Sequence, residues 1–192
     1  MRFTTFIGVV LMNFACGSHA ASNPAKPDGE SRIRIFGQNG AIAQLHAGKA
    51  CIKGHGERVS GSLGSAFGSL FGAVSNVSLG MPDTESTRNL SQMNGIASKA
   101  YFREYAIPAG IPTSLRLGYQ DVSSFYTVGN VRYSGPSASC SGAISFTPEA
   151  GRDYEVGFSW QGRACQLSVN QLVDEGGTTR LEPVPVQSAP KC

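Results

Sequence analysis

The stretch CSGAISFTPEAGRDYEVGFSWQGRACQLSVNQL, residues 140–172, decides the fold class. It holds three runs of alternating residues, separated by the turn sequences TPEAG (147–151) and QGR (161–163). Alternation with a period of two places every second side chain on the same face of a β-strand. In the middle run that face carries Tyr154, Val156, Phe158 and Trp160. The stretch therefore predicts three strands joined by two short turns.

The same pattern continues on the N-terminal side of this stretch. Residues 32–36 (RIRIF) alternate as in a half-buried strand, and QNG (38–40) is a typical hairpin turn before a returning strand at 41–45. Further strands are predicted at 101–107, 113–119 and 178–181, with an irregular one across 123–133. The chain is therefore predicted to be mainly β: a single-domain antiparallel β-sandwich over residues 32–182, followed by an extended tail at 183–192.

The N-terminus has the features of a secretory signal peptide. A short basic start precedes the uncharged run FIGVVLMNF (6–14), and SHA (18–20) offers small residues where a signal peptidase cleaves. Residues 1–20 are predicted to be removed, and 21–31 to form a flexible leader. Cys16, followed by Gly17 and Ser18, also suggests a lipid anchor, but Asn13 stands where lipoproteins carry an aliphatic residue. The predicted location is the periplasm or cell envelope, with lipoprotein anchoring as an alternative.

Four cysteines follow the signal peptide: Cys51, Cys140, Cys165 and Cys192. An even number in an exported chain predicts disulfides, and four cysteines allow three connectivities. Cys140 and Cys165 lie on predicted strands that flank one turn region, which favours their pairing. Cys51 would then pair with Cys192 and tie the tail to the body of the domain.

Residues 59–95 are predicted to form a glycine-rich insertion, either a helix or a loop. No charged residue lies between Arg58 and Asp83, and apolar residues recur every three or four positions from Val59 to Val77. Insertion of residues 59–82 into a membrane is the bolder interpretation of this pattern, and packing against the domain is the simpler one. Residues 84–93 are predicted to include a short helix capped by Asp83 or Thr84. The candidate partner surface combines apolar residues of this insertion with two loop aromatics: Leu63, Phe67, Leu70, Phe71, Phe125 and Tyr126.

The sequence offers little that would perform catalysis. No hydrolase, metalloprotease or phosphate-binding motif is present, no metal site or cofactor is predicted, and the formal net charge of +3 does not call for a nucleic acid partner. A Cys51–His55 nucleophile is conceivable but requires a free thiol. Arg103 and Glu104 are expected to be solvated charges, and Asp153 is expected to cap its turn.

Three stretches carry a resemblance to known sequences: GMPDT (80–84), YFREY (101–105) and FTPEAGRDYEV (146–156). Together they resemble a group of uncharacterised exported proteins and lipoproteins of Gram-negative bacteria, over roughly residues 33–172. The resemblance implies an exported, β-rich protein and no catalytic residues.

Three functions remain open from the sequence. The first is a non-enzymatic exported binding protein of the bacterial envelope, whose partner is a protein or another envelope component. The second is a periplasmic immunity protein that neutralises a delivered toxin. The third is an enzyme that uses Cys51 and His55.

Overall fold

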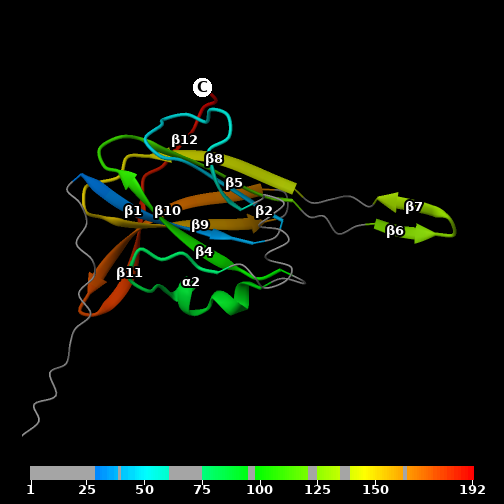
Figure 1. The fold of residues 1–192 in the computed structure, drawn as a ribbon, viewed down its shortest axis with the longest axis horizontal. Coiled ribbons are helices and arrows are strands. Elements are labelled where there is room, and N and C mark those ends of the chain that lie inside the picture. The colour runs from blue at the N-terminus through cyan, green and yellow to red at the C-terminus, as the bar shows by residue number, and fades with distance from the viewer. Residues whose placement is uncertain are drawn as a thin grey trace, which may run out of the picture.

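Two β-sheets stacked face to face form the body of the protein (Figure 1). The computed structural model describes residues 29–38, 40–60, 75–94, 98–120, 125–134, 139–161 and 164–192. The predicted β-sandwich is confirmed. The predicted signal peptide and most of the leader lie outside the described residues.

The first sheet has the strand order β11–β10–β9–β1–β4. Its strands are β1 (Glu30–Gly37), β4 (Tyr101–Pro108), β9 (Asp153–Gln161), β10 (Ala164–Glu175) and β11 (Thr178–Val184). Neighbouring strands are antiparallel except β1 and β9, which pair in parallel at the centre of the sheet. The N-terminal strand therefore lies between two strands from later in the chain.

The second sheet has the order β12–β8–β5–β2–β3, and its pairs are antiparallel. Its strands are β2 (Ala41–His46), β3 (Glu57–Ser60), β5 (Thr113–Gln120), β8 (Ser139–Phe146) and β12 (Gln187–Ser188). The turn at 147–151 therefore carries the chain from one sheet to the other. In the loop after β2, Ile52 makes an isolated bridge to Lys191 near the end of the chain.

The core lies between the sheets and comes from the alternating apolar positions. Ile33 and Ile35 of β1 and Leu115 of β5 belong to this core, and all three are fully buried. Phe146 and Tyr154 flank the crossing turn and meet edge to face, with ring centroids 5.1 Å apart. At the β3–β4 edge, the Tyr101 hydroxyl donates to the Val59 carbonyl at 2.9 Å and links the two sheets.

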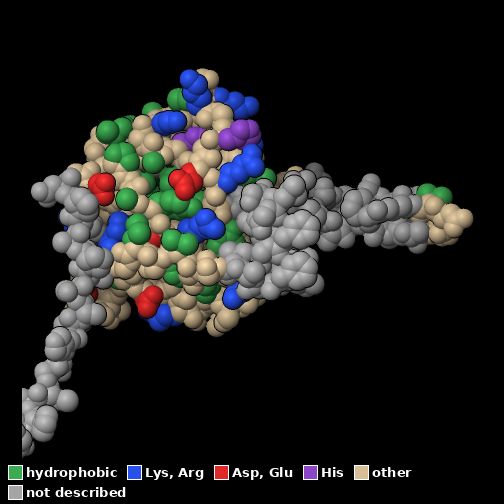
Figure 2. Space-filling model, in the orientation of Figure 1, with side chains coloured by type: hydrophobic (Ala, Val, Ile, Leu, Met, Phe, Trp, Pro, Cys, Tyr) green, Lys and Arg blue, Asp and Glu red, His purple; other side chains and the backbone are tan. Residues whose placement is uncertain are grey.

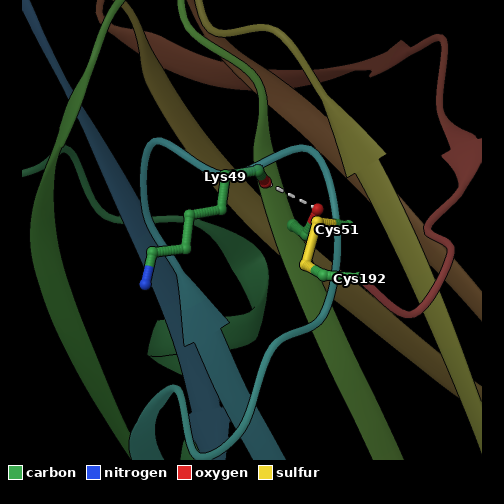
Figure 3. Close-up of a disulfide and its surroundings, with 4 residues drawn as sticks. Lys49, Cys51 and Cys192 are labelled. Carbon is green, nitrogen blue, oxygen red and sulfur yellow. Dashed lines mark hydrogen bonds between the residues drawn. A yellow bond between two sulfur atoms is a disulfide. The ribbon is translucent and has the colours of Figure 1, made fainter.

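Both predicted disulfides are present. Cys140 of β8 and Cys165 of β10 have Cα atoms 5.6 Å apart, so this bridge joins the two sheets. Cys51 and Cys192 have Cα atoms 5.3 Å apart and fix the tail to the loop that follows β2 (Figure 3). That loop also lies on the second sheet through Ser114, whose hydroxyl donates to the Lys49 carbonyl at 2.8 Å. Two intramolecular disulfides indicate an oxidising, exported environment.

The described part of the insertion is mostly not helical. Val77 pairs with Arg103 beside β4, and residues 78–84 continue without regular structure. Thr84 then caps the short helix α2 (Glu85–Arg88) with its hydroxyl, as predicted, and the 3-10 helix η1 (Leu90–Met93) follows. We call residues 77–84 the strap, because they lie across the outer face of the first sheet. None of the helices among the described residues is long and apolar enough to cross a membrane.

Candidate functional site

A row of three charged side chains crosses the outer face of the first sheet. Strand register places Arg34 of β1 opposite Glu104 of β4 on one side and Glu155 of β9 on the other. Arg34 donates to Glu104 Oε1 at 2.6 Å and to Glu155 Oε2 at 3.2 Å. All three residues are at most 3 % exposed. The prediction that Glu104 is solvated is wrong, because the strap covers it.

The strap is held by this row. Glu104 Oε2 accepts hydrogen bonds from the backbone of Leu79 and Met81 and from the Ser78 hydroxyl. In return, Arg34 Nη2 donates to the Met81 and Pro82 carbonyls, at 3.2 and 2.9 Å. Backbone groups that would otherwise be buried without partners are therefore satisfied by the charged row.

A second ion pair fastens the start of the same strands. Arg32 and Asp153 form two parallel hydrogen bonds of 2.8 Å each, and Arg32 Nη1 donates to the Leu79 carbonyl at 2.7 Å. The hydrogen bond and the charge of Asp153 raise the pKa of Arg32 despite its burial. Asp153 was expected to cap a turn, and it pairs with Arg32 instead because β1 lies beside it in register.

This buried network ties the strap to the three strands β1, β4 and β9. The two arginines, Arg32 and Arg34, pair with three carboxylates, so one negative charge is in excess. Hydrogen-bond donors from the strap stabilise it, and one of them is the Thr84 hydroxyl, 2.7 Å from Glu155 Oε2. The stretches 80–84, 101–105 and 146–156 all contribute to the network, through the strap, Glu104, and the pair Asp153 and Glu155.

The third sheet is a hairpin that extends from one end of the sandwich (Figure 1). It consists of β6 (Phe125–Val128) and β7 (Val131–Ser134), which pair only with each other among the described strands. Val128 and Val131 flank its two-residue turn and are 61 % and 54 % exposed. Apolar side chains are visible at this tip in Figure 2. The sequence prediction of a single irregular strand is wrong here, because Gly129 takes the positive φ that such a turn requires.

An apolar pocket of about 100 Å³ lies at the same end of the sandwich. The ends of β1, β5 and β9 and the start of β2 form its walls, and η1 forms its rim. The main lining side chains are Phe36, Ile42, Met93, Leu117, Val156 and Phe158. The hairpin starts where β5 ends, so pocket and hairpin share one end of the domain.

His46 lies at the far end of β2 from this pocket and is buried without a hydrogen bond. It is 2 % exposed, and neither ring nitrogen has a partner within the described part of the chain. Burial lowers the pKa of His46 below its ordinary value of 6.5, and the charges of Lys49 and Arg116 lower it further.

We expect His46 to make the protein less stable in mild acid. The unfolded chain takes up a proton near pH 6.5, whereas the folded chain resists it, so stability is complete above pH 6.5 and falls as the pH drops towards the lowered pKa. Urea unfolding between about pH 7.5 and about pH 5 should therefore give a weaker pH dependence for His46→Leu than for the wild type. The exposed His55 supplies the matched control, and an equal effect of His55→Leu would contradict the assignment.

The other predicted site residues lie only partly within the described part of the chain. Leu63, Phe67, Leu70 and Phe71 lie outside the described residues. Phe125 and Tyr126 lie on β6, and the structure describes their backbone only. Cys51 is bonded to Cys192, so it offers no free thiol, and His55 Nδ1 lies 3.0 Å from the Arg58 guanidinium. A Cys51–His55 nucleophile is therefore not formed. No group of three or more metal-binding side chains occurs within the described ranges.

Comparisons with protein-family models, curated proteins and solved structures find no match.

Proposed function

We propose that this protein is a non-enzymatic binding protein of the bacterial envelope, located in the periplasm, and that the β6–β7 hairpin contacts its protein partner. The observation that carries the proposal is the exposed apolar tip of a hairpin that stands apart from both sheets. The two disulfides, which indicate an exported environment, support the proposed location.

The physical argument starts from the weakness of an isolated hairpin. Two strands that pair only with each other are marginally stable in water. Both outer edges of such a hairpin present backbone donors and acceptors that a partner strand can use. Burial of Val128 and Val131 would add a hydrophobic contribution on binding. A partner that adds a strand to the hairpin and covers its tip would therefore pair the backbone groups at one edge and bury the two valines.

Site-specific photocrosslinking in the native host tests this proposal. A photoreactive residue at position 128 or 131 should give one or a few defined protein adducts, which mass spectrometry identifies. Position 111 is the matched control, because Ile111 is 50 % exposed on the main body, in the β4–β5 turn. The same adducts from positions 111 and 128, or none from the hairpin, would overturn the proposal.

Binding to the identified partner should then depend on the hairpin tip. We expect the double variant Val128→Asp with Val131→Asp to bind the purified partner at least about tenfold more weakly, the usual effect of losing a central apolar contact. Ile111→Asp should bind as the wild type does. An unchanged Kd for the hairpin variant would assign recognition to another surface.

A further inference from the structure

We propose that the apolar pocket at the hairpin end of the sandwich binds a small uncharged hydrocarbon group, either an aromatic ring or the end of an acyl chain. This site is separate from the protein contact proposed for the hairpin and does not depend on it. The walls of the pocket come from both sheets, from β1 and β9 of the first and from β2 and β5 of the second.

The chemistry of the lining selects the class of ligand. Among the described residues that line the pocket, none is charged, and Gln38 supplies the one polar side chain. A charged or sugar-like ligand would lose its hydration there without gaining enough partners. An apolar ligand would bind favourably, because its own surface and the surfaces of Leu117, Val156 and Phe158 would be removed from water.

The size of the pocket limits the ligand. An apolar protein cavity of about 150 Å³ holds benzene, and this pocket has a volume of about 100 Å³. The pocket is smaller than that cavity, so an aromatic ring or a chain end enters it in part, and the rest of the ligand lies at the open rim. A longer chain would have to continue past the rim.

The rim allows entry without unfolding the core. Met93 and Phe158 line the pocket yet are 43 % and 37 % exposed, so the pocket reaches solvent on their side. Met93 belongs to η1, which is tied to the β1–β2 turn by a hydrogen bond of 2.7 Å from the Gln38 amide to the Met93 carbonyl. That bond is exposed, and an unbranched methionine adapts its shape readily.

Titration with toluene, followed by NMR of the oxidised protein, tests the site. We expect saturable shifts of signals from Phe36, Leu117, Val156 and Phe158, while signals from the β10–β11 hairpin stay unchanged. Decanoate added to the toluene complex distinguishes the source of the ligand. Displacement of toluene indicates the end of an acyl chain, and binding of toluene without displacement by decanoate indicates a small free molecule.

Two matched variants make the test specific. Val156→Ala enlarges the pocket, whereas Val169→Ala removes the same methyl groups from a buried core position that does not line it. Val156→Ala should improve binding of propylbenzene relative to toluene by about fourfold for each methylene it accommodates. Val169→Ala should keep the wild-type ratio. The absence of saturable toluene shifts, or equal ratios in the two variants, would overturn the proposal.

Discussion

Replacing Arg34 with methionine should lower the free energy of unfolding by about 3–5 kcal/mol, the typical cost of leaving a buried charge without its partner. Methionine keeps an apolar stem but loses the guanidinium, so Glu104 and Glu155 remain buried on either side of β1 without a cation. The Met81 and Pro82 carbonyls lose a donor as well. Urea unfolding at neutral pH measures the change.

An arginine on the surface provides the control for this variant. Arg180 also pairs with two carboxylates, Glu175 and Glu182, but its side chain is 52 % exposed. Arg180→Met should change the free energy of unfolding by less than about 1 kcal/mol, because water and salt screen exposed pairs. If the two variants lost similar free energies of unfolding, burial would not explain the contribution of Arg34 to stability.

Removing the Cys51–Cys192 disulfide should cost about 5 kcal/mol in the loop-entropy model, and removing Cys140–Cys165 about 3.5 kcal/mol. The order follows from the sequence separations of 141 and 25 residues, because a longer closed loop restricts the unfolded chain more. Each pair is replaced by two alanines, so that no free thiol remains to form a wrong bridge. Urea unfolding of the two double variants measures both losses.

The opposite order of losses would contradict this prediction. It would mean that the tail stays in place without its covalent bond, through the hydrogen bonds of Ile52 with Pro190 and Cys192. The Cys140–Cys165 bridge would then matter more, because it fixes the two sheets to each other.

The sequence predicted the sandwich well because its inner faces follow a simple rule. Ile33 and Ile35, or Tyr154 and Val156, alternate with polar residues, and the apolar set lies in the core. The Cys140–Cys165 bridge could be predicted for a related reason, since strands that lie close to one turn region bring their cysteines within bonding distance. The Cys51–Cys192 bridge was then the remaining pair.

The outer face of the first sheet could not be predicted in this way. Arg32 and Arg34 alternate with isoleucine as residues exposed to solvent do, and only the strap, more than 40 residues further along the chain, buries them. One pattern did carry information: Arg-x-Arg in β1 is matched in spacing by Asp-x-Glu in β9. Its use required knowing that β1 and β9 are neighbours, which depends on the complete fold.

The candidate sites depend on similar long-range arrangements. Four strands and η1 contribute to the pocket, and the buried His46 has Gly56, from the loop after β2, close against its ring. The hairpin is different, since Gly129-Asn130 between two valines is a local turn pattern. A search for two-residue turns would have divided the predicted strand at 123–133 into β6 and β7.

The parallel pairing of β1 with β9 has a consequence for the order in which the chain can fold. Arg32 must wait for Asp153, 121 residues later, before the centre of the first sheet can form. Contacts between such distant residues slow folding, because a large loop has to close first. During synthesis β1 can therefore pair with β4 first, while its other edge stays open until β9 is available. The first sheet of such a topology is completed only from the C-terminal strands β9, β10 and β11, so its stability is gained late.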